Sequence, residues 1–253
     1  MDLGLADRVY VLTGASRGLG FATAQCLVAD GARVVISSRD EERVKEAVER
    51  LGGSAGAAGI AADLSDPATP GRLVDLAQER FGRLDGALIS VGGPPPGSAL
   101  QVSDEQWEQA FRTVFLGAIR TARTVAARLD AGGAIGFVLS TSVRQPIPGL
   151  GISNGLRPGL AGAAKDMADE LGPRGIRVVS LLPGRVKTDR MKELIAASGD
   201  PDRAASEFEA QIPLRRMAEP EEFGRVAAFA LSPAASYLTG LTLPVDGGSV
   251  RGY

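Results

Sequence analysis

Short apolar runs alternate with amphipathic stretches along the whole chain. Most of the runs are rich in β-branched residues and stop at glycine, proline or a polar residue, which is typical of strands. We expect strands at residues 8–13, 33–37, 58–62, 87–91, 135–139, 176–182 and 241–245. The run at 176–182 is apolar on both faces, which favours a strand buried inside a parallel sheet.

The segments between the runs repeat their apolar positions every three or four residues, as amphipathic helices do. They predict helices at 17–30, 40–51, 103–129 and 156–171, and one helix after each of Pro67 and Pro220. This alternation predicts an α/β fold with helices on both faces of a parallel sheet. No stretch has the composition of a linker, so residues 1–253 are expected to form a single domain.

Residues 185–217 break the alternation. The segment is too long for an ordinary connection between strand and helix, so we expect short helices and a lid-like insert there. Its apolar residues either cover an apolar substrate or pack onto the body of the protein, and the sequence leaves both alternatives open. They are Met191, Leu194, Ile195, Phe208, Ile212 and Leu214.

The composition narrows the possible chemistry. One cysteine and no histidine exclude an intrachain disulfide, a cysteine- or histidine-based metal site and a hydrolase with a histidine base. The formal net charge is −2, so no nucleic-acid partner is expected. No apolar stretch approaches the ~20 residues of a membrane span. The N-terminus lacks a signal-peptide pattern. We therefore expect a cytoplasmic protein with no membrane partner.

A glycine-rich turn joins the first predicted strand to the first helix. It reads TGASRGLG at residues 13–20. Glycines let the backbone approach a pyrophosphate, and the helix N-terminus supplies N–H donors and a positive dipole end. The alternative is a merely tight strand–helix turn. The turn offers these candidate dinucleotide contacts: Gly14, Ser16, Arg17, Gly18, Leu19 and Gly20.

The end of the second strand bears on the choice of cofactor. An acidic residue there would bind the ribose hydroxyls and repel a 2′-phosphate, but this chain has Ser37, Ser38 and Arg39. With Arg17 in the glycine turn, Arg39 favours NADP(H) over NAD(H). Asp40 argues in the opposite direction, and both arginines can also be solvated surface residues.

Taken together, these motifs resemble the short-chain dehydrogenase/reductase family, in particular its 3-oxoacyl-acyl-carrier-protein reductase-like members, over essentially the whole chain. Besides the glycine turn, the matching features are Ala62-Asp63-Leu64, Leu181-Leu182-Pro183-Gly184 with Thr188, and Val245-Asp246-Gly247-Gly248. The resemblance implies a Rossmann-type, doubly wound sheet of about seven strands. It also implies a homotetramer or homodimer and a small-molecule carbonyl or acyl substrate.

The resemblance further implies contacts to the cofactor. Asp63 would contact the adenine, and Pro183, Gly184 and Thr188 would hold the nicotinamide end. Leu64 belongs to the same expected set. Ser90-Val91-Gly92-Gly93 stands where the family has Asn-Asn-Ala-Gly, and it brings Ser90 and Gly92 into the set.

The catalytic positions depart from the family pattern of Asn, Ser, Tyr and Lys. Alignment without gaps places Ser153 at the tyrosine and Arg157 at the lysine, and Phe115 replaces the asparagine. Ser140, thirteen residues before Ser153, matches the family serine, and Ser142 fits that role less well. Ser140, Ser153 and Arg157 are therefore the candidate catalytic residues, with Arg157 also expected to touch the cofactor.

This exchange alters the acid–base chemistry. A phenol of pKa about 10, lowered by a lysine, exchanges protons near neutral pH, whereas a serine hydroxyl is far less acidic. Arg157 stays protonated, so it can bind the ribose or stabilise an alkoxide but cannot act as an acid. The tyrosines Tyr10, Tyr237 and Tyr253 are remote in sequence. Tyr10 is expected in the core, and Tyr253, near the C-terminus, could reach another subunit.

Two functions follow from this pattern. The first is an NADP-dependent oxidoreductase acting on a carbonyl/alcohol pair, with the proton supplied by water, Ser153 or the substrate. The second is a catalytically degenerate NADP(H)-binding protein that serves as a sensor or partner subunit. Dehydration or epimerisation on the same scaffold is a third possibility that no residue specifically favours. Arg144, with Arg157, either clamps a substrate carboxylate or phosphate or lies on the surface.

Overall fold

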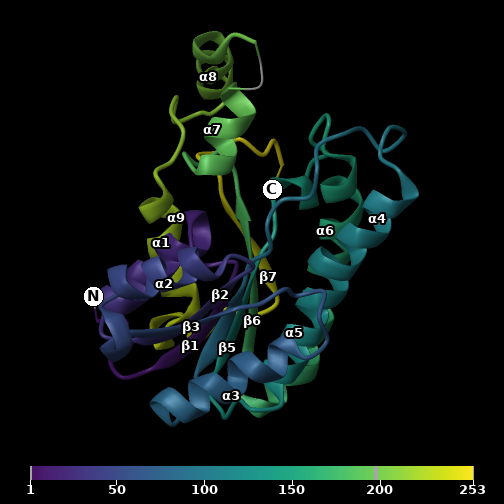
Figure 1. Ribbon diagram of the computed structural model, residues 1–253. Helices are drawn as coiled ribbons and strands as arrows, with labels where there is room; N and C mark the ends of the chain where they lie inside the picture. The colour runs from purple at the N-terminus through teal and green to yellow at the C-terminus, as the bar shows by residue number, and fades with distance from the viewer. Residues whose placement is uncertain (1, 197–198, 253) are drawn as a thin grey trace.

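A parallel sheet of seven strands forms the centre of the computed structural model, which describes residues 2–196 and 199–252 (Figure 1). The strand order is β3-β2-β1-β4-β5-β6-β7, so the direction of winding reverses between β1 and β4. This is the doubly wound, Rossmann-type arrangement expected from the sequence. The strands are β1 Val9–Thr13, β2 Arg33–Ser38, β3 Ala57–Ala61, β4 Gly86–Ile89, β5 Ala134–Val138, β6 Arg177–Pro183 and β7 Leu241–Val245.

Helices cover both faces of the sheet (Figure 1). Helices α3, α5 and α6 pack on one face, and α1, α2 and α9 pack on the other. The helices are α1 Gly18–Ala29, α2 Glu41–Arg50, α3 Thr69–Phe81, α4 Asp104–Ala110, α5 Gly117–Ala126, α6 Gly151–Leu171, α7 Asp189–Ala196, α8 Pro201–Ala210 and α9 Pro220–Leu231. In the described residues, no helix combines the length and hydropathy that a bilayer span requires.

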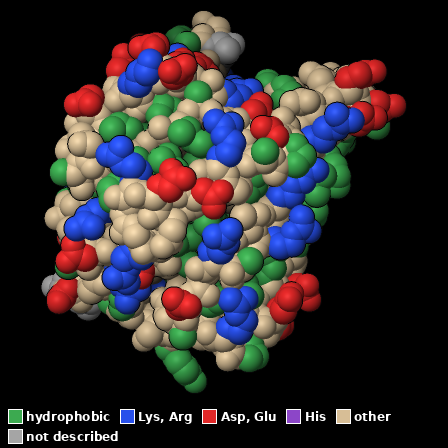
Figure 2. Space-filling view, turned by 60° about the horizontal axis from the view of Figure 1, so that its bottom comes forward, with side chains coloured by type: hydrophobic (Ala, Val, Ile, Leu, Met, Phe, Trp, Pro, Cys, Tyr) green, Lys and Arg blue, Asp and Glu red, His purple; other side chains and the backbone are tan. Residues whose placement is uncertain are grey.

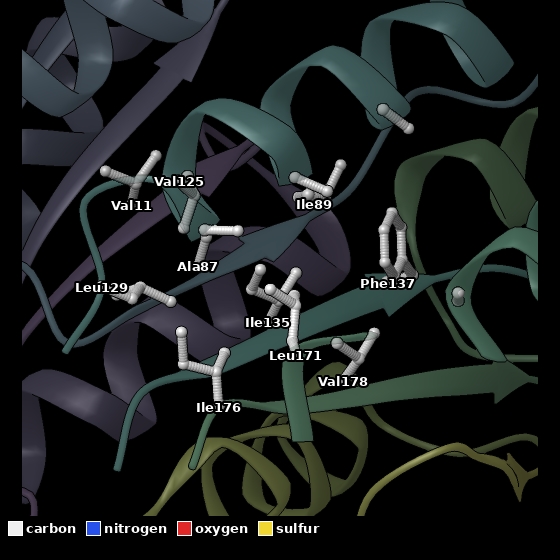
Figure 3. Packing of buried hydrophobic residues seen from close by; sticks show 14 of the residues in the cluster. Val11, Ala87, Ile89, Val125, Leu129, Ile135, Phe137, Leu171, Ile176 and Val178 are labelled. Carbon is white, nitrogen blue, oxygen red and sulfur yellow. The ribbon is translucent and has the colours of Figure 1, made fainter. Parts of the chain in front are cut away.

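Alternation of side chains along the strands divides the core between the two faces. Val9 and Val11 belong to the cluster under α3, α5 and α6, whereas Tyr10 and Leu12 belong to the cluster under α1 and α9. Figure 3 shows the first cluster, in which strand residues such as Ile135 lie opposite residues such as Leu171. Both faces of the strands are therefore apolar, as a parallel sheet requires.

The helix predicted at 103–129 is interrupted. Ser103 caps α4 through a capping box with Gln106, and a π-helical turn, Phe111–Leu116, then separates α4 from α5. The rings of Phe111 and Phe115 stack with their centroids 5.3 Å apart. The apolar period runs through this turn unchanged, so the pattern gave no sign of an interruption.

The insert at 185–217 contains α7 and α8, which stand beyond the carboxyl edge of the sheet (Figure 1). A bridge between Val186 and Ala218 closes its base, and Lys187 Nζ lies 2.8 Å from a carboxylate oxygen of Glu219. Neither α7 nor α8 has a fully buried side chain. The helices α7 and α8 therefore pack loosely, whereas Val186, Ile212 and Met217 of the same insert are buried.

On the face of the molecule shown in Figure 2, acidic and basic side chains are interspersed. This distribution agrees with a formal net charge of −2.

Candidate active site

A cleft of about 820 Å³ opens at the carboxyl edge of the sheet, where the strand order reverses between β1 and β4. Ligands of open α/β sheets bind in the crevice at such a switch point. Eight residues predicted from the sequence to touch a cofactor line this cleft. They are Gly14, Ser16, Arg17, Arg39, Asp63, Leu64, Ser90 and Gly92.

The glycine turn has a geometry that only glycine satisfies at its key positions. Gly14 has φ +59°, and a Cβ there would lie 2.7 Å from the Ser90 carbonyl oxygen. A Cβ at Gly20 would lie 2.8 Å from the Gly14 carbonyl oxygen. No side chain caps the first turn of α1. The N–H groups of that turn can therefore bind an anion, and the turn fits a pyrophosphate.

The hydroxyl of Thr13 ties the glycine turn to β4. Thr13 Oγ1 donates to the Ser90 carbonyl at 2.8 Å and accepts from the Ser90 N–H at 2.9 Å. Both residues are buried, so this pair of hydrogen bonds fixes the spacing between β1 and β4 where the cleft begins.

Four charged residues gather at the end of the cleft formed by β2 and α2: Arg17, Arg39, Asp40 and Arg43. Asp40 caps α2 by accepting the Arg43 N–H at 3.1 Å, and its other carboxylate oxygen lies 3.1 Å from Arg43 Nε. Sequence reasoning missed Arg43. Its position three residues after Asp40 on the helix that follows β2 was the available signal.

Arg17 also reaches the insert. Its Nη1 lies 3.7 Å from Asp189 Oδ2 and 4.0 Å from Glu193 Oε1, both on α7. A Cβ on Gly18 would lie 3.7 Å from Cγ2 of Thr188, so Thr188 sits directly beside the glycine turn. The base of the insert therefore borders the position expected for a cofactor phosphate.

Several other predicted site residues lie beyond this cleft, at the ends of β5 and β6. Leu139 N–H donates to the Leu181 carbonyl at 2.8 Å, which places Ser140 and Pro183 on neighbouring strand ends. Gly184 packs against Asp246, because a Cβ there would lie 2.7 Å from the Asp246 Cα. Gly18, Leu19 and Gly20 form the first turn of α1.

Arg157 is a buried cation on α6. It is 7% exposed, and its Nη1 donates to the Val138 carbonyl at the end of β5 at 2.9 Å. Burial is the one cause that lowers the pKa of Arg157, to about 10, so the guanidinium remains charged at neutral pH. Every fully buried side-chain nitrogen or oxygen among the described residues has a hydrogen-bond partner. Nε and Nη2 of Arg157, which make no hydrogen bond to the described residues, are therefore not fully buried.

Three serines meet beside Arg157. Ser153 Oγ lies 3.0 Å from Ser142 Oγ, and the Ser142 N–H donates to Ser140 Oγ at 3.1 Å. Ser153 and Ser142 are 5% and 3% exposed. The hydroxyl in contact with Ser153 is thus that of Ser142, which fitted the family serine less well in sequence. The direction of a side chain within the short 3-10 turn at Thr141–Val143 is not visible in a sequence pattern.

The remaining candidates lie apart from the serines. Phe115 packs beside Gly159, and Arg144 Nη2 donates to Thr242 Oγ1 of β7 at 2.7 Å. Tyr10 is fully buried in the core, and burial raises its pKa to about 12. Tyr237 precedes β7, at the edge of the sheet opposite the cleft. Tyr253 lies outside the described residues.

Comparisons with known proteins extend over the whole chain. The sequence profile of a family described as enoyl-(acyl carrier protein) reductase matches residues 14–250. The human protein dehydrogenase/reductase SDR family member 2, mitochondrial, is 34% identical over 250 residues, which are 98% of this chain and 88% of that protein.

Two solved structures have nearly the same backbone. The L-sorbose reductase of Gluconobacter frateurii, complexed with NADPH and L-sorbose, gives a TM-score of 0.92 at 28% identity, with both chains fully covered. A short chain oxidoreductase of Pseudomonas aeruginosa PAO1, described as containing an atypical catalytic center, gives 0.90 at 27% identity, again with both chains fully covered.

The family profile covers most of the chain, and the glycine turn and the order of the strands agree with it. Nicotinamide cofactors are the cofactors of this family, and the turn and cleft described above fit a dinucleotide. The chain therefore belongs to the short-chain dehydrogenase/reductase family and is an oxidoreductase of that type.

Proposed function

We propose that the protein is an NADP-dependent oxidoreductase that transfers hydride between NADP(H) and a carbonyl or alcohol group of a small molecule. The observation that carries the choice of NADP(H) is that Arg17 and Arg39 line one end of the same cleft. A 2′-phosphate carries a double negative charge, which guanidinium groups bind well. The NADPH bound by the related L-sorbose reductase supports the same choice.

The cleft supplies the remaining contacts. Gly14, Ser16, Gly18, Leu19 and Gly20 hold the pyrophosphate against the start of α1. Asp63 contacts the adenine, with Leu64, Ser90 and Gly92 along the floor of the cleft. Pro183, Gly184 and Thr188 hold the nicotinamide end, and the lid-like insert at 185–217 covers the substrate. The bound nicotinamide supplies or accepts the hydride.

At the catalytic end, Ser153 and Arg157 stand in place of the family's tyrosine and lysine. Arg157 is a fixed positive charge that orients the nicotinamide ribose or stabilises a developing alkoxide. The proton comes from water, from Ser153 or from the substrate. Ser140, at the position of the family serine, is the third catalytic residue of the proposal. The related oxidoreductase described as containing an atypical catalytic center supports a departure of this kind on the same fold.

A second candidate function is a catalytically degenerate NADP(H)-binding protein. The observation that favours it is the contact between the Ser153 and Ser142 hydroxyls, which are buried and bonded to each other. Hydroxyls engaged in this way have fewer free positions for a substrate oxygen. A general acid typically raises the rate of a catalysed reaction by roughly 10²–10⁴-fold, so its absence lowers the rate of hydride transfer without abolishing it.

One experiment separates the two candidates. The protein is assayed with NADPH against a panel of small carbonyl compounds, beside the double variant Ser153→Tyr/Arg157→Lys, which restores the family's residues. Oxidation of NADPH by the parent protein establishes an oxidoreductase. Tight NADPH binding by the parent with turnover only in the double variant establishes the binding protein instead.

A further inference from the structure

Asp40 poses an electrostatic problem for NADP(H) at this site. It lines the cleft directly after Arg39, at the end where the 2′-phosphate is proposed to bind, and its carboxylate would repel that phosphate. A carboxylate at this corner accepts hydrogen bonds from the two ribose hydroxyls and repels a phosphate, so Asp40 alone would select NAD(H).

Arg43 engages both oxygens of that carboxylate. Its backbone N–H donates to Asp40 Oδ1 at 3.1 Å, and its Nε lies 3.1 Å from Asp40 Oδ2. The pair spans the first turn of α2, so the backbone of the helix fixes the spacing between the two residues. The Asp40 carboxylate is thus held against the start of α2, and each of its two oxygens already has a partner on Arg43.

Arg43 faces the cofactor side of α2. It lines the main cleft and also a smaller adjoining hollow of about 220 Å³ that contains Ser16, Arg17 and Asp189. Both partners are about half exposed, 51% for Arg43 and 47% for Asp40. Water and salt therefore screen the pair, and its effect is modest in size.

We propose that Arg43 is a specificity-determining residue for the cofactor, acting by neutralising Asp40. With Arg43 present, the corner between β2 and α2 accepts a 2′-phosphate on Arg17 and Arg39. Without the Arg43 guanidinium, Asp40 keeps the backbone N–H on Oδ1 but loses the charge that neutralises it, so its Oδ2 accepts a ribose hydroxyl in preference. This inference rests on the proposed use of NADP(H) and names the residue pair that sets the preference.

The test measures the affinities for NADPH and NADH by calorimetry in the parent protein, Arg43→Ala, Asp40→Asn and the double variant. Asparagine is an equally good N-cap, so Asp40→Asn removes the charge without uncapping α2. Arg43→Ala should lower the NADPH-over-NADH ratio about fivefold at low salt and less at high salt. The double variant should return the ratio close to that of Asp40→Asn.

Lys45→Ala is the matched control. Lys45 carries the same charge on the same helix but pairs with Glu41 at 3.1 Å and Glu42 at 3.0 Å, and it lines neither hollow. Lys45→Ala should leave the NADPH-over-NADH ratio unchanged. If this variant lowers the ratio as much as Arg43→Ala does, the effect comes from the overall positive charge of α2, and the inference is overturned.

Two further outcomes overturn the inference. An unchanged ratio in Arg43→Ala does so directly. If the NADPH-over-NADH ratio of the double variant is as low as that of Arg43→Ala, Arg43 contacts the phosphate itself and does not act through Asp40. Failure of the proposed function looks different, because the parent protein would then bind NADH as well as NADPH. A ratio that falls in Arg17→Ala and Arg39→Ala but not in Arg43→Ala rejects the inference alone.

Discussion

Arg157 combines burial, charge and a single hydrogen bond to the Val138 carbonyl. Among the described residues, desolvation alone shifts its pKa, and no carboxylate offsets the cost of burying the charge. Such a cation is costly in a folded protein unless a polar or anionic ligand shares the site. This is the physical ground for placing Arg157 at the nicotinamide ribose or a developing alkoxide.

Replacing Arg157 with alanine should therefore lower turnover and weaken NADPH binding together. We expect a loss of roughly 10²-fold in kcat/KM, comparable to the loss of one electrostatic donor in an active site. Arg157→Lys, which keeps the charge, should retain most of both properties. Steady-state kinetics and calorimetry check this prediction. Unchanged cofactor affinity in Arg157→Ala would show that Arg157 does not contact the cofactor.

Ser153→Ala should cost much less than Arg157→Ala. A serine hydroxyl is a poor acid, and water can take its place, so the loss should stay well below the roughly 10²–10⁴-fold of a true general acid. The same kinetic assay measures it. A loss as large as that of Arg157→Ala would make Ser153 the proton donor.

The pH dependence of the site should follow Arg157. If Ser153 occupies the place of the tyrosine as proposed, activity should be flat from about pH 7 to 9 and should fall as the pH passes about 10, where Arg157 loses its proton. Stability should change in the opposite direction. Burial lowers the pKa of Arg157 to about 10 in the folded protein, well below its ordinary value, so the cost of burying the charge is relieved and stability rises as the pH increases above about 10.

Activity and unfolding measured across pH 7–11 separate these two effects. A steep loss of activity between pH 7 and 9 with intact folding would reveal an acid not recognised in the described residues.

At the scale of the elements, the predicted strands agree with the structure because short apolar runs that are rich in β-branched residues and end at glycine or a polar residue favour strands. Three features escaped prediction. The π-helical turn at Phe111–Leu116 leaves the apolar period intact. Helix α6 begins at Gly151, before its apolar stripe, because residues such as Asn154 are polar and bond to the preceding loop. Contacts such as Ser142–Ser153 depend on side-chain directions, which sequence spacing does not fix.

Arg177, at the start of β6, joins the sheet to the end of α9. Its guanidinium is 7% exposed and donates to the carbonyls of Ala230, Leu231, Ser232 and Leu238 at 2.8–3.2 Å. These acceptors lie at and beyond the C-terminus of the helix, where carbonyls lack partners within the helix. One side chain therefore binds the last two carbonyls of α9 and two carbonyls beyond its end.

Arg177→Ala should destabilise the protein by about 3 kcal/mol, because buried carbonyls lose charged donors. Arg174→Ala is the control, since Arg174 donates to only two carbonyls, Ala126 and Leu129, from a more exposed position. Its cost should be about 1 kcal/mol. Urea unfolding measures both, and equal costs would contradict the role given to Arg177.

At the scale of the whole molecule, α4, α5 and α6 lie along one side of the fold (Figure 1). Phe111 remains 44% exposed there and stacks on Phe115, while Gly155 and Gly159 of α6 leave room for the rings of Trp107 and Phe115. An exposed aromatic ring suits packing against a second copy.

We therefore predict a tetramer built on these helices. Light scattering should give four times the chain mass of 26.1 kDa. Phe111→Glu should lower the assembled mass, whereas Leu214→Glu, which changes an exposed residue of the insert, should not. A measured mass near 26.1 kDa for the parent protein would contradict the predicted tetramer.

Arg17 is shared between two parts of the molecule. It faces the cleft and also contacts Asp189 and Glu193 at the start of the insert. Binding of the proposed phosphate to Arg17 would therefore be thermodynamically linked to the position of α7. A phosphate that binds Arg17 would weaken the contacts of Arg17 with Asp189 and Glu193 of α7. By reciprocity, these contacts with α7 would lower the affinity of Arg17 for the phosphate. NADP(H) and NAD(H) carry the same nicotinamide, yet they would leave the insert with different populations of conformations.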